Sequence, residues 1–247
     1  MHNTICESCM TRNYRPVLHD RSIGGLRNKY KGAHIAVVGA SPTAVLYVPH
    51  STDVSIAVNG AALLSEEFDY FVCSDPDAPA RPWFGRKCAK IRVIAMSIAT
   101  MDRQLYPSEF DGHIDRRAVP WGSQHRITAP PPVQPHYVFH CSFPSKGELE
   151  AFSGGWSTNL MVRGTVAGQA IQLAFIMGAA EISLFGCSYS RDTSRSENHY
   201  SYQCQQHQIG CIQTYHIEAM NTYISIIRQH GVPVNVIGPS ALTCPPS

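Results

Sequence analysis

Short apolar runs alternate with helical patterns along most of the chain. The runs are four or five residues long, rich in β-branched residues, and closed by small or polar residues. That combination is typical of strands buried on both faces of a parallel sheet. The predicted strands are residues 34–38, 54–58, 69–73, 91–95, 137–140, 181–185 and 234–237.

Two helical patterns lie between the later strands. Residues 165–178 are apolar on most faces, begin at Thr165 as an N-cap and end at a glycine, which predicts a buried helix. A second set of residues recurs at helical spacing before a Gly stop and the last predicted strand: Ile212, Tyr215, Ala219, Tyr223 and Ile227. Strands that alternate with helices indicate a mostly parallel sheet covered on both faces. We therefore expect an α/β fold, a Rossmann-like doubly wound sheet with a small lid segment.

The remaining segments divide the chain into an arm and one domain. Residues 1–32 are polar and irregular and predict an N-terminal arm, whereas residues 33–247 predict a single domain. Residues 103–135 are rich in Pro, Gly and charge, and we expect a long excursion over the sheet edge. A polar loop follows the strand at 181–185, and we expect a lid at about 187–210. Long loops in compact domains commonly carry function.

Composition and charge exclude several classes of partner. The 247 residues are 44% hydrophobic and 15% charged, as in an ordinary globular protein, and the net charge of +2 gives no basis for binding nucleic acid or an anionic membrane. No apolar run approaches the roughly 20 residues that a membrane span needs. The first residues contain no signal-peptide core, so we expect a cytoplasmic protein.

The nine cysteines leave two interpretations open. Cys6 and Cys9 form a C-x-x-C pair, and Cys204, His207 and Cys211 lie close together later in the chain. A strong zinc signal needs two such pairs at the usual spacing, and only one is present. The other interpretation is free thiols on a terminal segment and on a helix face, and we expect no metal site.

The candidate site consists of residues that follow the predicted strands, because open α/β sheets bind ligands beyond the carboxyl ends of their strands. These ends supply glycines that allow close backbone approach, hydroxyls that can donate to phosphate oxygens, an amide and a carboxylate. The candidates taken from the strand ends are Gly39, Ala40, Ser41, Asn59, Gly60, Asp75, Ser188, Pro239 and Ser240.

The first of these loops, "GASPTAVL", matches neither common phosphate motif. It has no Lys of the Walker loop and no dinucleotide glycine spacing, so it suits a mononucleotide or a nucleotide-sugar phosphate better. Simpler interpretations remain open for the other candidates. Asn59 and Gly60 can form a plain turn, and Asp75 can cap a helix. A loop histidine such as His199 can lie on the surface without a functional role.

The order of several motifs resembles a known enzyme family. "VVGASPT", "AVNGA", "GTVAGQAIQLAFIMGAAEISLFGCSYS", "NHY" and "VIGPSAL" are similar to the bacterial sialyltransferases of glycosyltransferase family 42. They are also similar to a related group with motility-factor glycosyltransferase domains and 6-hydroxymethyl-7,8-dihydropterin pyrophosphokinases. The resemblance covers roughly residues 33–245.

The resemblance implies an inverting transfer of a sialic or related nonulosonic acid from a CMP-activated donor to a glycan or protein hydroxyl. His199 in "NHY" would be the general base, and Tyr189 and Tyr200 would stabilise the departing phosphate, with no required metal. The Gly39 to Ser41 loop and Asn59 would bind the CMP part of the donor. We count Thr165 and Gly186 among the nucleotide-binding candidates as well. Relatives often associate, so the resemblance also suggests a homo-oligomer.

This sequence also departs from the family pattern. Ser41 and Pro42 are exchanged relative to the usual Gly-x-Gly-Pro-Ser loop, and Ser188 occupies the place of a common aspartate. A pyrophosphokinase that uses ATP and Mg²⁺, held by Asp75 and Asp77, therefore stays an alternative. A nucleotide-binding relative that has lost activity is the third hypothesis.

Overall fold

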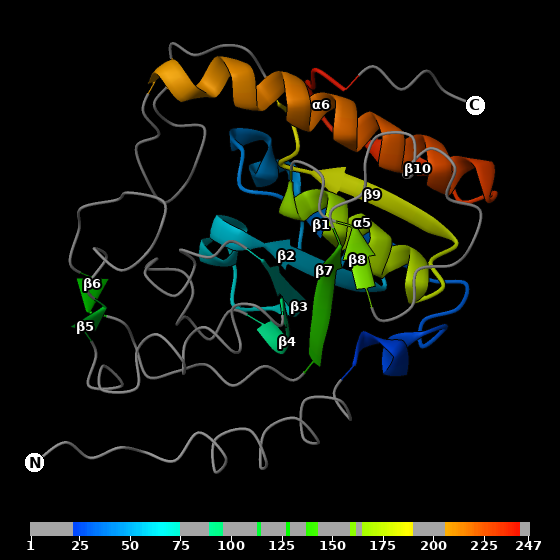
Figure 1. Ribbon diagram of the computed structural model, residues 1–247. Coiled ribbons are helices and arrows are strands. Elements are labelled where there is room, and N and C mark those ends of the chain that lie inside the picture. Colours follow the sequence, from blue (N-terminus) through cyan, green and yellow to red (C-terminus); the bar gives the residue numbers. More distant parts are fainter. Residues whose placement is uncertain are drawn as a thin grey trace, which may run out of the picture.

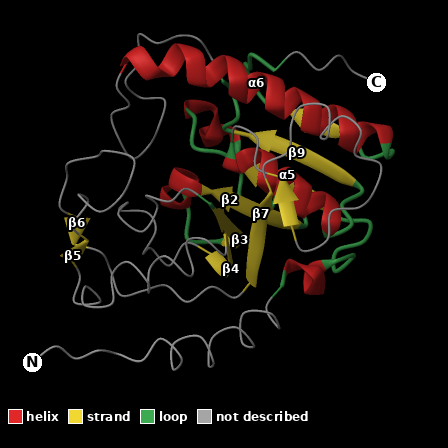
Figure 2. Ribbon diagram, in the orientation of Figure 1, coloured by secondary structure: helices red, strands yellow, loops and turns green. Residues whose placement is uncertain are grey.

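The computed structural model describes residues 22–74, 89–95, 113–114, 127–128, 137–142, 159–161, 165–189 and 206–242. An eight-stranded sheet lies at its centre, with the order β10-β9-β1-β2-β3-β4-β7-β8 and every neighbouring pair parallel (Figure 1). Two long helices flank this sheet (Figure 2). The predicted α/β class with a parallel sheet is confirmed.

Three strands have the predicted bounds, namely β1 (His34–Val38), β2 (Val54–Val58) and β9 (Glu181–Phe185). Four others differ from the prediction by one or two residues at an end, because pairing with a neighbour, rather than local sequence, decides where a ladder stops. These are β3 (Phe68–Cys73), β4 (Ala89–Ala95), β7 (Tyr137–Ser142) and β10 (Val234–Val236).

Several short elements were not predicted. The strand β8 (Asn159–Met161) forms one edge of the sheet, and β5 (His113–Ile114) pairs antiparallel with β6 (Ile127–Thr128) inside the segment predicted to be irregular. Two or three residues carry too little periodicity to be recognised. Three 3₁₀ turns of four or five residues were also missed, because a single turn is too short to show a helical period: η1 (Ile23–Leu26), η2 (Pro42–Leu46) and η3 (Asn59–Leu63).

Both predicted helices are present. Helix α5 (Val166–Ile176) begins at the predicted N-cap, where the Thr165 hydroxyl accepts a hydrogen bond from the Ala167 amide at 3.2 Å. Helix α6 (Gln206–Gln229) starts inside the predicted lid, so residues 206–210 are helical. None of the described helices combines the length and apolarity needed to cross a membrane.

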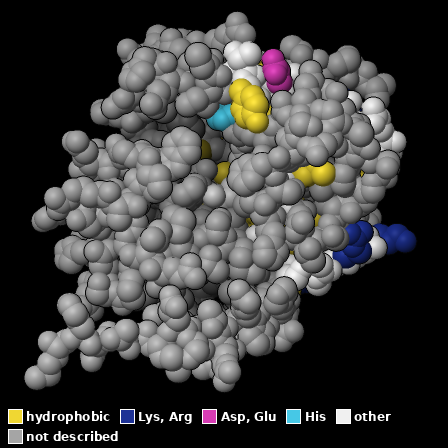
Figure 3. Space-filling model, viewed as in Figure 1, with side chains coloured by type: hydrophobic (Ala, Val, Ile, Leu, Met, Phe, Trp, Pro, Cys, Tyr) yellow, Lys and Arg dark blue, Asp and Glu magenta, His cyan; other side chains and the backbone are white. Residues whose placement is uncertain are grey.

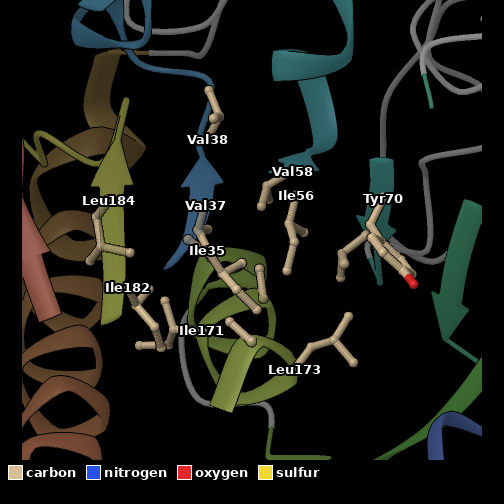
Figure 4. Close-up of a cluster of buried hydrophobic side chains, with 14 of the residues drawn as sticks. Ile35, Val37, Val38, Ile56, Val58, Tyr70, Ile171, Leu173, Ile182 and Leu184 are labelled. Atoms are coloured by element: carbon tan, nitrogen blue, oxygen red, sulfur yellow. The ribbon is translucent and has the colours of Figure 1, made fainter. Parts of the chain in front are cut away.

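The main core lies between the sheet and α5 (Figure 4). Ile35 and Val37 of β1 point toward this helix and meet Ile171, and all three side chains are fully buried. Nearly every residue of α5 is buried, which explains why its sequence is apolar on most faces. Gln169 and Gln172 are the buried polar residues of α5, and the amide of Gln172 exchanges hydrogen bonds with the backbone of Met161 in β8.

Helix α6 packs against α5 through a glycine. A Cβ added at Gly168 would lie 2.5 Å from the ring of Tyr223, so only a glycine allows this ring to rest on the α5 backbone. The Tyr223 hydroxyl then donates to the Met161 carbonyl at 2.8 Å. One contact therefore joins both helices to the edge strand β8.

The described part of the predicted N-terminal arm packs onto the domain. Ile23 and Leu26 of η1 are fully buried. The amides of Asn28, Tyr30 and Gly32 donate to three successive carbonyls at the end of α5, at 2.8–2.9 Å, and so satisfy groups that a helix end leaves unpaired. Exposed basic side chains gather at this corner of the surface (Figure 3).

An acidic side chain links the starts of β2, β3 and β4. Asp69 accepts hydrogen bonds from the Ser55 amide and hydroxyl at 3.0 and 3.1 Å, and its other oxygen lies 2.7 Å from Lys90 Nζ. Burial by itself raises the pKa of Asp69, but the bonds from Lys90 and Ser55 outweigh it and hold the pKa below its ordinary value.

This lowered pKa predicts a stability that depends on pH. Asp69→Asn should lower the free energy of unfolding by roughly 1 kcal/mol at pH 7, because it removes a charge-assisted pair that is partly open to solvent. A lowered pKa stabilises the fold above the unfolded-state value of about 4, and that contribution is lost as the pH falls through the folded-state value. Urea denaturation should therefore show a smaller difference between wild type and variant at pH 3 than at pH 7. An equal difference at both pH values would contradict this assignment.

Candidate functional site

The candidate site lies where the strand order changes direction. From β1 the chain proceeds to β2, β3 and β4 on one side, whereas β9 and β10 lie on the other side of β1. The connections that leave β1 and β9 therefore diverge at the carboxyl edge of the sheet. In open α/β sheets this divergence leaves a crevice in which ligands bind.

Two glycines bring the ends of β1 and β9 into direct contact. The Gly39 amide donates to the Phe185 carbonyl at 2.8 Å, and the Ser41 amide donates to the Gly186 carbonyl at 3.0 Å. A Cβ at Gly39 would lie 2.5 Å from the Gly186 oxygen, and one at Gly186 would collide with the Gly39 oxygen. Gly186 also has a φ of +63°, which favours glycine. No other residue pair fits this approach.

Serine side chains join the surrounding loops. The Ser41 hydroxyl accepts from the Ser188 amide at 3.2 Å, which links the loop after β1 to the loop after β9. The Ser240 hydroxyl lies 3.0 Å from the carbonyl oxygens of Cys187 and Ser188 and accepts from the Leu242 amide. Both hydroxyls were predicted to donate to phosphate, and here the proton of Ser240 is directed toward these carbonyls. We call Gly39, Ser41, Gly186, Ser188 and Ser240 the switch-point cradle.

The other nucleotide-binding candidates lie around this cradle. Ala40 is partly exposed between Gly39 and Ser41, and Pro239 is exposed on the last loop. Asn59 and Gly60 begin η3 at the end of β2, one strand away from β1. Asn59 has a left-handed φ of 49°, which asparagine tolerates better than most residues. The turn interpretation of this pair is therefore correct locally, and a ligand contact stays a prediction.

Tyr189 extends the cradle toward both helices. Its φ of 46° is unusual for a bulky residue, and its hydroxyl lies 3.1 Å from the hydroxyl of Thr165, the N-cap of α5. The start of α5 and the end of β9 thus meet at one edge. Burial, aided by the neighbouring Cys187, holds the pKa of Tyr189 well above its ordinary value, so this phenol stays a hydrogen-bond donor at any working pH.

His216 of α6 is a neighbour of the site that the sequence analysis missed. Its ring centroid lies 6.4 Å from that of Tyr189 in an edge-to-face arrangement, and 6.3 Å from that of Tyr215. The sequence gives His216 no motif, because only the packing of α6 beside the end of β9 brings it here.

Cys187 lies beneath the cradle as an inert thiol. It is buried and free, and burial raises its pKa to about 12, so the reactive thiolate is not formed near neutral pH.

Several predicted residues lie outside the described residues: Asp75, Asp77, His199, Tyr200, Cys6, Cys9 and Cys204. Only the backbone is described for His207 and Cys211, within α6. In the part of the chain that the structure describes, no group of three or more His, Cys, Asp or Glu side chains is placed to hold a metal ion.

The described walls of the site carry no charge. Residues 39–46, 59–64, 186–189 and 237–242 contain only uncharged side chains, so amides and hydroxyls are the polar groups that they offer. No protein-family model and no curated protein matches the chain significantly. The family resemblance drawn from the motifs, with the roles it implies, therefore stays a prediction.

Proposed function

We propose that this chain is a transferase that binds a nucleotide through its phosphate at the switch-point cradle, and that the nucleotide is the CMP part of an activated sugar. The observation that carries this proposal is the close contact between the loops after β1 and β9, whose described side chains are uncharged, at the point where the connections from these strands diverge. The finer description of the sheet as Rossmann-like and doubly wound belongs to the same proposal.

An uncharged cradle favours a phosphate of low charge. A phosphodiester, as in a CMP-activated sugar, carries one negative charge, whereas the triphosphate of ATP needs cationic side chains or a metal ion. The backbone amides of Ala40 and Tyr189 have no hydrogen-bond partner in the described chain, so they can donate to phosphate oxygens. The N-terminus of α5 at the same edge adds a favourable dipole.

The chemistry follows from the resemblance. The acceptor hydroxyl loses its proton to His199 and its oxygen forms a bond to the anomeric carbon of the donor, while the bond from that carbon to the phosphate oxygen breaks and CMP leaves. Attack opposite the leaving group inverts the anomeric centre. Tyr189 supports this scheme as a neutral phenol able to donate to the developing phosphate charge. The acceptor is a glycan or protein hydroxyl, in the cytoplasm.

Ligand-induced thermal shifts test the proposal. A ligand that binds only the folded state raises the melting temperature, and at about 100 times its Kd it stabilises by roughly 2.7 kcal/mol. CMP should raise the melting temperature of the wild type without added metal. A shift with ATP and Mg²⁺ alone would refute the proposal in favour of the pyrophosphokinase. A shift with neither ligand would refute nucleotide binding itself.

A further inference from the structure

Helix α6 carries a stripe of side chains that faces the core. Tyr215, Ala219 and Tyr223 are four residues apart along the helix and so share one face. Ala219 and Tyr223 are fully buried, whereas Tyr215 is 44% exposed. The inward stripe therefore continues to Tyr215, at a point where the core no longer covers it.

The position of α6 explains this exposure. Helix α6 precedes β10, and its first half extends beyond the carboxyl ends of the strands (Figure 1). A hydrophobic side chain and a histidine lie exposed side by side over this helix (Figure 3). Tyr215 lies in this first half of α6 and on the same face as Ala219 and Tyr223, so it is beside the carboxyl edge (Figure 1).

The aromatic rings form a continuous run from the cradle outward. Ser188 of the cradle is followed by Tyr189, whose ring contacts His216 at 6.4 Å, and the His216 ring contacts that of Tyr215 at 6.3 Å. Tyr189 and His216 are partly buried, so exposure increases along the run. If the phosphate of a nucleotide binds at the cradle, the base of that nucleotide would lie against these rings.

We propose that Tyr215, His216 and Tyr189 form a stacking subsite for the base of a nucleotide whose phosphate lies at the switch-point cradle. This inference rests on the proposed function and names the part of the site that recognises the base. Aromatic side chains bind bases by stacking on their π-faces. Tyr and His also carry a polar atom that water can hydrate, so their rings can lie at an exposed edge. The exposed neighbours Thr214 and Glu218 are polar, and Tyr215 is the one exposed large apolar side chain among those described on α6, which is too little apolar area for a protein-docking patch.

The test compares two variants and two probes by isothermal titration calorimetry. Tyr215→Leu keeps an apolar side chain but removes the ring, whereas Tyr215→Phe keeps the ring and serves as the matched control. Tyr215→Leu should weaken the binding of CMP by about 5- to 150-fold, the loss expected for one stacked base. The same variant should bind ribose 5-phosphate, which has no base, as the wild type does. Tyr215→Phe should bind CMP like the wild type.

The outcomes separate the inference from the proposal beneath it. If the wild type binds CMP and Tyr215→Leu binds it equally well, the stacking subsite is refuted while the proposed function stands. If Tyr215→Leu weakens the binding of CMP and of ribose 5-phosphate equally, Tyr215 affects the phosphate site or the fold. That result also refutes stacking. If Tyr215→Leu changes the molecular mass measured by light scattering but not the affinity for CMP, Tyr215 belongs to an interface between copies of the chain, and the stacking subsite is refuted. Failure of the wild type to bind CMP refutes both.

Discussion

Replacing Gly186 by alanine should destabilise the protein by about 3 kcal/mol or more, the largest effect expected of any single methyl group at the site. Two costs combine. The φ of +63° is a left-handed conformation, which costs a residue with a Cβ roughly 1–2 kcal/mol. The added Cβ would also collide with the carbonyl oxygen of Gly39 and lie 2.7 Å from the Ala44 side chain, so β1 and β9 would have to separate at their ends.

Gly231 provides the matched control for this substitution. It has a φ of +79°, but a Cβ there would meet nothing within 4 Å. Gly231→Ala should therefore report the backbone cost alone, about 1 kcal/mol once the reduced freedom of the unfolded chain is included. Chemical denaturation of both variants gives the two free energies of unfolding. Equal losses in the two variants would mean that the cradle tolerates a side chain and that β1 and β9 do not approach this closely.

Replacing His199 by alanine should lower sugar transfer by roughly 10²- to 10⁴-fold, the contribution typical of a general base. The affinity for CMP should stay nearly unchanged, because the base acts on the acceptor hydroxyl and not on the nucleotide. The measurement is release of CMP from CMP-sialic acid in the presence of glycan acceptors, with CMP affinity determined in parallel. A loss of turnover without a loss of CMP affinity distinguishes a catalytic base from a residue that holds the lid in place.

His50 supplies the control for this second prediction. Its side chain is 73% exposed and contacts Glu67 at 3.2 Å on the surface before β2. His50→Ala should leave both turnover and CMP affinity unaltered, since loss of one exposed side-chain contact far from the cradle changes little. Turnover by His199→Ala at the wild-type rate would rule this histidine out as the base.

Much of the architecture could be predicted because local sequence and burial agree. The strands of the sheet centre are mostly apolar, as expected of strands covered on both faces, and β1, β2 and β9 have the expected bounds. Thr165 carries a cap signal that does not depend on distant residues, and it does cap α5. The rule that ligands bind at the carboxyl edge correctly grouped the loops after β1 and β9, which touch through Gly39 and Gly186.

Other features depend on contacts between residues far apart in the chain. Sequence reasoning treated Ser41 and Ser240 as phosphate donors, but whether a hydroxyl faces a ligand or a neighbouring loop is decided by tertiary packing. His216 and Tyr215 join the site only because α6 extends past the strand ends. The buried side chains of η1 likewise pack against a distant core, which an irregular local pattern does not reveal.

The sequence by itself therefore determined the class of fold, the approximate positions of seven strands of the main sheet, and the grouping of the loops after β1 and β9 at one edge. These depend on burial patterns and chain direction, which the order of residues encodes locally. Tertiary structure alone decided the strand order, the contact between Gly39 and Gly186, and the aromatic run that ends at Tyr215. Each of these arises when segments distant in sequence pack together, and their mutual distances are set by the whole core.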